Sequence, residues 1–212
     1  PALHVTVLQR ATEVDESRTR RALETLTEEH HLLARTGAGY RFSHERLRRA
    51  TLATATTSRL QDLRGRIAKA ILAEWDVPDV RLADRAVDLL EAAGNPGAAV
   101  KVCGDLAGRL EKRGDIPGAT ARYRRTLELA SGDDILSPLA ELDLCLCAGR
   151  SAMHSLELEL ADRTLTRAVE LAGAQSDARR GAEARVLQCR TRARQGRLEE
   201  AVTLAQEAIP MA

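Results

Sequence analysis

The stretch GNPGAAVKVCGDL, residues 94–106, joins a glycine to a helical pattern in which small and apolar residues share one face. Gly94 lies five residues before Ala99, and Cys103 and Leu106 follow Ala99 at i+4 and i+7. Glycine commonly ends a helix in the left-handed conformation, and the i, i+4, i+7 spacing aligns side chains along one stripe. The stretch therefore predicts a turn between two helices that pack closely against each other through Ala99.

The same arrangement recurs farther along the chain. GDIPGA (114–119) and GRLEEA (196–201) each carry a glycine five residues before an alanine. The i+4 and i+7 positions after each alanine are mostly small or apolar: Tyr123 and Thr126 after Ala119, Ala205 and Ala208 after Ala201, and Leu165 and Ala168 after Ala161, which has no glycine at that offset. The sequence therefore predicts an internal repeat of helix pairs from residue 78 onward.

Composition favours helices around an aliphatic core. Aromatic residues make up only 2% of the 212 residues, so the core has to be built from leucine, alanine, valine and isoleucine. The net charge of +1 gives no overall bias toward an acidic or a basic partner. The distribution is uneven, with nine basic and two acidic residues in 35–69 and seven basic and one acidic residue in 179–197.

The first part of the chain begins with two predicted helices, at residues 4–11 and 18–31. Asp15 or Ser17 is the expected cap of the second helix, because short polar side chains accept hydrogen bonds from the first free N–H groups. Its expected apolar face consists of Ala22, Leu23 and Leu26.

A β-hairpin is predicted next, because HLLART and YRFSH alternate loosely on either side of Gly37-Ala38-Gly39. Helices near 45–56 and 58–75 follow, and the order of helices and hairpin is that of a winged helix-turn-helix. The residues WDVP, 75–78, indicate a boundary. We therefore expect a winged-helix domain with connecting helices at 1–76 and a helical repeat domain at 77–212.

Parts of the sequence resemble two known families. From about residue 80 to 209 the Gly-x-x-x-x-Ala pattern resembles the second helix of the tetratricopeptide repeat (TPR), although the alanines at 119, 161 and 201 are 42 and 40 residues apart and a standard repeat has ~34 residues. The whole order, with Arg-Phe-Ser-His at 41–44 and EAAGNPGAAV at 91–100, resembles the region behind the ATPase core of bacterial STAND-type signalling regulators. These resemblances imply a mainly α fold, with a small winged-helix domain carrying one β-hairpin and then a TPR-like α-solenoid of antiparallel helix pairs.

The second resemblance also implies a nucleotide switch in a longer parent protein. The phosphate-binding core would lie before Pro1, and no G-x-x-x-x-G-K-[ST] motif occurs in these residues. The winged domain would then act as a lid, with His44 contacting the phosphate of bound ADP, so ATP or ADP is expected in the parent and no cofactor in this chain. The alternative is that His44 packs against or caps the helix that follows it.

Two groups of arginines are candidate binding residues. Arg46 and Arg49 belong to the basic run after the hairpin and could face DNA, although the helix that would enter the groove carries several glutamates. A solvated face, or a face toward an acidic ATPase surface, is the preferred interpretation. Arg185, Arg190, Arg192 and Arg194 could line a groove for an acidic peptide, or form a solvated helix face.

No catalytic or metal site is expected. Cys145 and Cys147 are separated by one residue, which places them about 200° apart on a helix, and Cys103 and Cys189 occupy helix-packing positions, so we expect reduced thiols in the core. The histidines show no nucleophile–base arrangement. No segment has the length and apolar character of a membrane span, and no signal peptide begins the chain, so a cytoplasmic location is expected.

The functional hypothesis is a non-catalytic regulatory and protein-interaction region, a sensor or docking surface, of a larger STAND-like ATPase. Its partners would be a protein or peptide and the ATPase domain of the same parent. Two alternatives remain open. One is a DNA-binding transcription regulator with a winged helix and a TPR effector domain, and the other is a stand-alone TPR scaffold.

Overall fold

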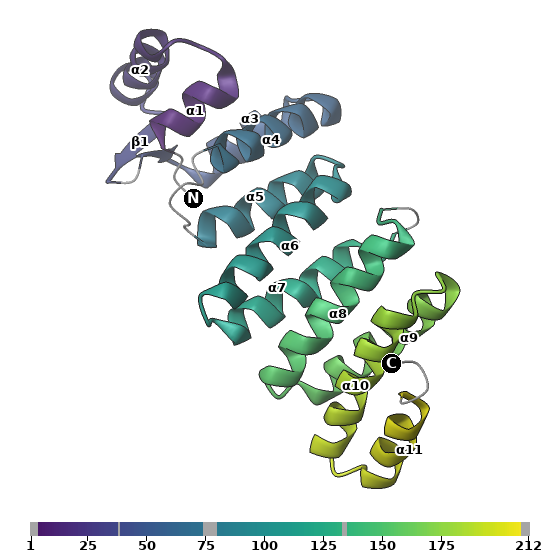
Figure 1. Cartoon of the computed structure of the whole chain (residues 1–212). Coiled ribbons are helices and arrows are strands. Elements are labelled where there is room, and N and C mark those ends of the chain that lie inside the picture. Colours follow the sequence, from purple (N-terminus) through teal and green to yellow (C-terminus); the bar gives the residue numbers. More distant parts are fainter. Residues whose placement is uncertain (1–3, 38, 74–79, 133–134, 209–212) are drawn as a thin grey trace. The chain divides into compact units, whose positions relative to one another are not determined.

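A computed structural model describes residues 4–37, 39–73, 80–132 and 135–208, and within them the protein is mainly helical with one small antiparallel hairpin (Figure 1). The elements in chain order are α1 (Val5–Thr12), α2 (Glu16–Glu24), the π-helical turn η1 (Thr25–Glu29), β1 (Leu33–Thr36), β2 (Gly39–Phe42), α3 (Glu45–Ala53), α4 (Thr57–Leu72), α5 (Val80–Ala92), α6 (Pro96–Lys112), α7 (Ile116–Leu129), α8 (Pro138–His154), α9 (Leu158–Ala174), α10 (Ala178–Arg194) and α11 (Leu198–Ala208). In this part of the chain, every helix is too short or too polar to cross a lipid bilayer.

By internal packing the chain divides into a first unit, residues 1–99, and a second unit, residues 100–212. The division falls within α6. The domain boundary predicted at 76/77 lies in a stretch, 74–79, outside the described residues, so that boundary stays a prediction.

The core of the first unit lies between α1, α4 and α5. α4 packs against both α1 and α5, and the buried side chains include Val7 and Ala11 of α1 and Ile71 of α4. Thr56 caps α4 by accepting a hydrogen bond from the N–H of Arg59 at 3.3 Å. The predicted helices at 4–11, 45–56 and 58–75 correspond to α1, α3 and α4, each shifted by a few residues.

The second predicted helix is split. α2 begins after Asp15, whose carboxylate accepts from the N–H of Arg18 at 3.0 Å, which confirms one of the two expected caps. The chain then widens into the π-helical turn, which changes the rotation per residue. Leu23 is buried and Leu26 half-buried, but Ala22 is exposed. The prediction for Ala22 was wrong because the buried stripe starts at Thr19 and continues through Leu23.

The predicted hairpin is present. Leu33 pairs with Phe42 and Thr36 with Gly39, so that the two strands are connected by residues 37 and 38. The end of β2 is tied back by Ser43, whose Oγ donates to the carbonyl of His31 at 2.7 Å and whose N–H donates to the carbonyl of Leu32 at 3.0 Å.

Five of the turns between consecutive helices share one backbone geometry. The residues in the left-handed conformation have φ between 55° and 82°: Gly94, Gly114, Leu156, Ser176 and Gly196. In every case the next residue donates its N–H to the carbonyl five positions earlier, at 2.9 or 3.0 Å. This is the hydrogen bond of the Schellman motif, which satisfies a free carbonyl at the helix end. The glycine turns were predicted, whereas those at Leu156 and Ser176 were not.

Each turn is followed, five residues after the left-handed position, by a buried small residue. These residues are Ala99, Ala119, Ala161, Gly181 and Ala201. The positions predicted on the same helix faces are also buried: Cys103, Leu106, Tyr123, Thr126, Leu165 and Ala168. Ala205 is exposed, contrary to prediction, because α11 packs against α10 and the described chain supplies no later helix to cover its other side. The side chain of Ala208 lies outside the described residues.

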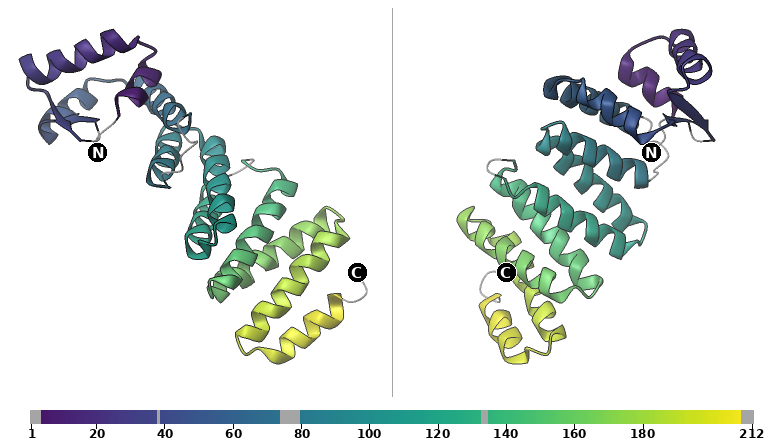
Figure 2. Two further views of the ribbon diagram at one scale, coloured as in Figure 1. Left: turned by 60° about the vertical axis from the view of Figure 1, so that its left-hand side comes forward. Right: turned by 180° about the vertical axis from the view of Figure 1, so that it is seen from behind.

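The helices of the second unit pack in chain order, α7 against α8, α8 against α9, α9 against α10 and α10 against α11 (green to yellow in Figure 2). α8 and α9 pack tightly at Gly149 of α8, where an added Cβ would lie 2.6 Å from the side chain of Leu165. A buried hydrophobic cluster joins α8, α9 and α10 and includes Leu142, Leu165 and Leu187.

Candidate functional site

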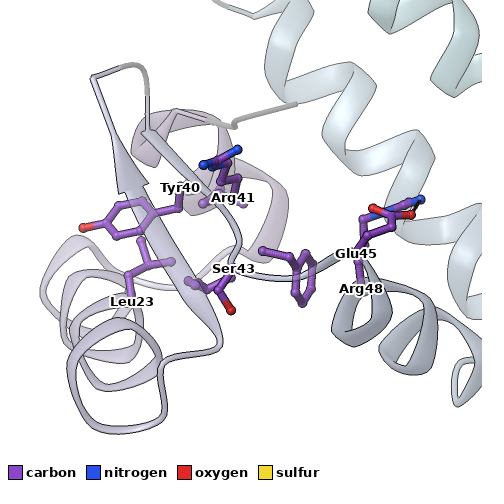
Figure 3. Close-up of a pocket in the computed structure, with 9 residues that line it drawn as sticks. Leu23, Tyr40, Arg41, Ser43, Glu45 and Arg48 are labelled. Carbon is purple, nitrogen blue, oxygen red and sulfur yellow. Dashed lines mark hydrogen bonds and ion pairs between the residues drawn. The ribbon is translucent and has the colours of Figure 1, made fainter.

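An open cavity of about 560 Å³ lies in the first unit between the hairpin and the helices α1 and α2 (Figure 3). We call it the hairpin cavity. Its apolar lining comes from both strands and both helices: Leu8, Leu23, Leu33, Tyr40 and Phe42. The polar lining consists of Arg41, Ser43, Glu45 and Arg48. In the view of Figure 3, Leu23 and Tyr40 lie together at one end, and Glu45 and Arg48 lie together on α3 at the other.

Strand alternation explains why this side of the hairpin is apolar. Leu33 pairs with Phe42, and Tyr40 is two residues before Phe42, so all three side chains project from the same face. Arg41 and its partner Ala34 belong to the opposite face. Arg41 therefore borders the cavity at the strand edge, and the charge at the mouth comes mainly from α3.

The first turn of α3 carries a charged cluster. The carboxylate of Glu45 accepts from Arg48 Nε at 2.9 Å and from Arg48 Nη2 at 2.5 Å, and from Arg49 Nε at 3.3 Å. The hydrogen bonds from Arg48 are the main reason that the pKa of Glu45 is lowered to about 2. Glu45 is thus ionised at neutral pH and compensated by two cations, and Arg46 adds a further exposed positive charge.

α3 packs weakly against the rest of the first unit. None of its nine residues is buried, and its main described contact is with β2. Short helices are marginal in water without tertiary packing. α3 is therefore held mainly by its connections to β2 and α4 and by the ion pairs of its first turn.

His44 stands at the N-terminus of α3. Its backbone is extended, with φ −134° and ψ 138°, its side chain is exposed, and the imidazole makes no capping hydrogen bond to the helix. The capping alternative for His44 is therefore not what the structure contains. An exposed imidazole beside free N–H groups can donate to an anion.

The arginines predicted on α10 do not form one surface. Arg192 pairs with Asp162 of α9 at 3.0 Å and with Glu200 of α11 at 2.8 Å. Arg185 borders a small crevice against α9, about 230 Å³ in volume. Arg194 donates instead to the carbonyl of Met153 in α8 at 2.8 Å. Arg185 and Arg192 thus lie on the side of α9, whereas Arg194, and Arg190 one turn before it, lie on the side of α8.

A different surface joins α8 and α10. Arg180 Nε lies 2.9 Å from Asp143, and Arg150 forms an ion pair with Glu183, so two pairs of opposite charge connect the helices. Val186, which is 44% exposed, follows Glu183 on α10. Arg190 is exposed one turn farther on.

The cysteines are free thiols. Cys103 and Cys145 are buried, and Cys147 and Cys189 are half-buried. Burial raises the pKa of Cys145 to about 12, so this thiol stays protonated at neutral pH. Among the described residues no three or more histidine, cysteine or acidic side chains converge in a way that would hold a metal ion.

Sequence reasoning missed the hairpin cavity. The alternation of the strands was visible, but the cavity depends on Leu8 and Leu23 meeting the hairpin from separate helices. Comparison with known proteins adds no family assignment, since no protein-family model matches the sequence and no curated protein matches it significantly.

Proposed function

We propose that this chain is a non-catalytic regulatory and protein-interaction region of a larger STAND-like signalling ATPase, with a winged-helix-like first part and a TPR-like solenoid. The observation that carries the proposal is the turn that recurs at Gly94, Gly114, Leu156, Ser176 and Gly196, each followed by a buried small residue at the same offset. Repeating one turn and one packing position stacks helix pairs and builds an extended surface for a protein or peptide.

The surface of α8 and α10 is the part of the solenoid that we assign to partner binding. Val186 and Arg190 are exposed on α10, and the pairs Arg150–Glu183 and Arg180–Asp143 connect α10 to α8. Apolar and cationic groups on a rigid surface suit a peptide that carries both apolar and acidic residues. Arg185 and Arg192 are engaged on the side of α9 and contribute to this surface less directly.

A pair of valine variants tests the assignment. Val186→Asp places a charge on the α8–α10 surface, and Val202→Asp places the same charge on α11, where the valine is 57% exposed. Affinity capture from lysate of the source cells should recover a partner with the wild-type chain and with Val202→Asp, and lose it with Val186→Asp. Equal capture by all three chains would remove this surface from the proposal.

The nucleotide part of the proposal rests on the resemblance and on the position of His44. Its exposed imidazole at the start of α3 is free of a capping role. In the full product of the native gene, His44→Ala should accelerate the release of bound ADP, while His154→Ala, which alters an exposed histidine of α8, should leave release unchanged. A native product that neither retains nucleotide nor hydrolyses ATP would contradict the ATPase context and leave the two alternatives, a DNA-binding regulator and a stand-alone TPR scaffold.

A protein partner is preferred over DNA because of the charges beside the hairpin. The segment that a winged helix would insert into a groove, α2 and the π-helical turn, exposes Glu24, Glu28 and Glu29 as well as Arg18, Arg20 and Arg21, which makes a poor recognition helix. Carboxylates there would be repelled by DNA phosphates. Duplex DNA should therefore bind weakly even at low salt, as measured by fluorescence anisotropy.

A further inference from the structure

We propose that the hairpin cavity docks the apolar face of an acidic amphipathic helix supplied by a partner protein. This inference deepens the proposed protein-interaction function, on which it rests, and assigns a second docking site in the first unit. The α8–α10 surface is not part of it.

The cavity has the size and lining of a binding site. Its volume of about 560 Å³ lies within the ~300–1,000 Å³ usual for ligand-binding clefts. Five apolar side chains from four elements face it, and Phe42 remains 36% exposed at its edge. Covering these side chains would remove apolar surface from water, which is the main favourable contribution to association.

Charge decides which partner fits. Among the residues that line the cavity, Arg41 and Arg48 are cationic and Glu45 is the single acid, and all three side chains are exposed. The wall beside the cavity is therefore net positive. A partner whose apolar residues enter the cavity would meet these arginines with its flanks, and complementary charges there accelerate association and exclude basic partners.

A helix is the partner that matches the geometry best. An amphipathic helix presents apolar residues at i, i+4 and i+7 as a row, and such a row can enter a cavity lined by apolar side chains. α3 begins at the mouth of the cavity with none of its residues buried, so a second helix could pack along it. DNA is disfavoured because phosphates gain nothing from Leu23, Leu33 or Phe42.

The test uses the whole chain and a fluorescein-labelled synthetic peptide. The probe has leucine at i, i+4 and i+7 and glutamate at most other positions. The first control has the same composition with the leucines scattered around the helix, and the second has lysine in place of glutamate. Fluorescence anisotropy should show the probe binding at least about tenfold more tightly than either control, with an affinity that falls as salt is raised.

Chain variants locate the site. Phe42→Ser should weaken binding of the probe by about tenfold or more, while Leu198→Ser, at an exposed leucine of α11, should leave the affinity unchanged. Arg41→Glu should weaken binding of the probe several-fold, and Arg163→Glu, the same charge change at an exposed arginine of α9, should leave it unchanged. Arg41 is exposed and is not part of the buried core, so this variant keeps its meaning even if Phe42→Ser disturbs the fold.

Three results would overturn the proposal. They are no binding of the probe at low salt, equal binding of the probe and the scattered-leucine control, and displacement of the probe by duplex DNA at comparable concentration. None of them bears on partner capture through Val186, so failure of this inference can be told from failure of the proposed function.

Discussion

Asp162 of α9 and Arg192 of α10 form an ion pair of 3.0 Å in which the two side chains are only 18% and 21% exposed. The other carboxylate oxygen of Asp162 lies 3.4 Å from Arg197, and Glu200 of α11 binds both arginines. Three helices therefore meet at one charged cluster. Shielded pairs are more sensitive to the loss of one partner than exposed ones, because the remaining charge stays poorly hydrated.

Asp162→Ala should therefore destabilise the chain by about 1–3 kcal/mol, because it leaves two arginines with one shared carboxylate. The free energy of unfolding from urea titration measures the loss. Glu16→Ala is the control, since it breaks an exposed pair with Arg20 within α2, and should cost only about 0.3–0.5 kcal/mol. Similar small effects for both variants would mean that the cluster adds no more than a surface pair.

Leu156→Gly should stabilise the protein by about 0.5–1 kcal/mol. Leu156 has φ 65°, a conformation that disfavours side chains with a Cβ, and is 70% exposed, so its removal loses little packing. Thermal unfolding followed by circular dichroism should show a higher midpoint. Gly114→Ala, at φ 82°, should lower the midpoint. A lower midpoint for Leu156→Gly would indicate that the leucine side chain contributes packing that outweighs the strain.

Two glycine-to-alanine substitutions should have opposite signs. At Gly149 the added Cβ would lie 2.6 Å from Leu165, so α8 and α9 would have to separate, at a cost of about 1–3 kcal/mol. At Gly173, also inside a helix, nothing lies within 4 Å, and alanine should add about 0.5–1 kcal/mol through its better helix propensity. Chemical denaturation of both variants checks the pair, and stabilisation by Gly149→Ala would contradict the close approach of the two helices.

The ion pair that Glu45 forms with Arg48 in the first turn of α3 should break as the pH is lowered. Because Arg48 lowers the pKa of Glu45 from 4.5 to about 2, the ion pair contributes fully above about pH 4.5 and is lost as the pH falls toward about 2. An NMR titration of the Glu45 carboxyl carbon should give a midpoint near 2, and Arg48→Gln should raise it. A wild-type midpoint near 4.5 would mean that the pair does not persist in solution.

The repeating turn could be predicted only where glycine occupies it. Gly94, Gly114 and Gly196 have the positive φ that the sequence indicated. Leu156 and Ser176 adopt the same conformation without the residue type that favours it, because the hydrogen bond that ends the helix and the close-packed residue five positions later fix the backbone there. The small residues Ala161 and Gly181 were the remaining signal in the sequence.

The candidate sites also differ in whether the local sequence could predict them. Local patterns gave the hairpin, the cap Asp15 and the position of His44 at the start of a helix. The π-helical turn after α2 has no local signature of its own, and the hairpin cavity arises from side chains distant in sequence. Spacing alone could not show which arginines of α10 lie on one surface. Contacts with α8, α9 and α11 determine which of these side chains form ion pairs or hydrogen bonds.

The left-handed residues at 156, 176 and 196 are twenty residues apart, and the chain resumes after each with the same backbone hydrogen bonds. Excision of residues 157–196 would join Leu156 directly to Arg197, and the new junction would keep the local geometry of the old ones. The helix following α8 would then be α11, which runs in the same sense as the α9 it replaces. With equivalent turns at these positions, a chain can gain or lose a whole helix pair by duplication or deletion while keeping the same type of turn between helices.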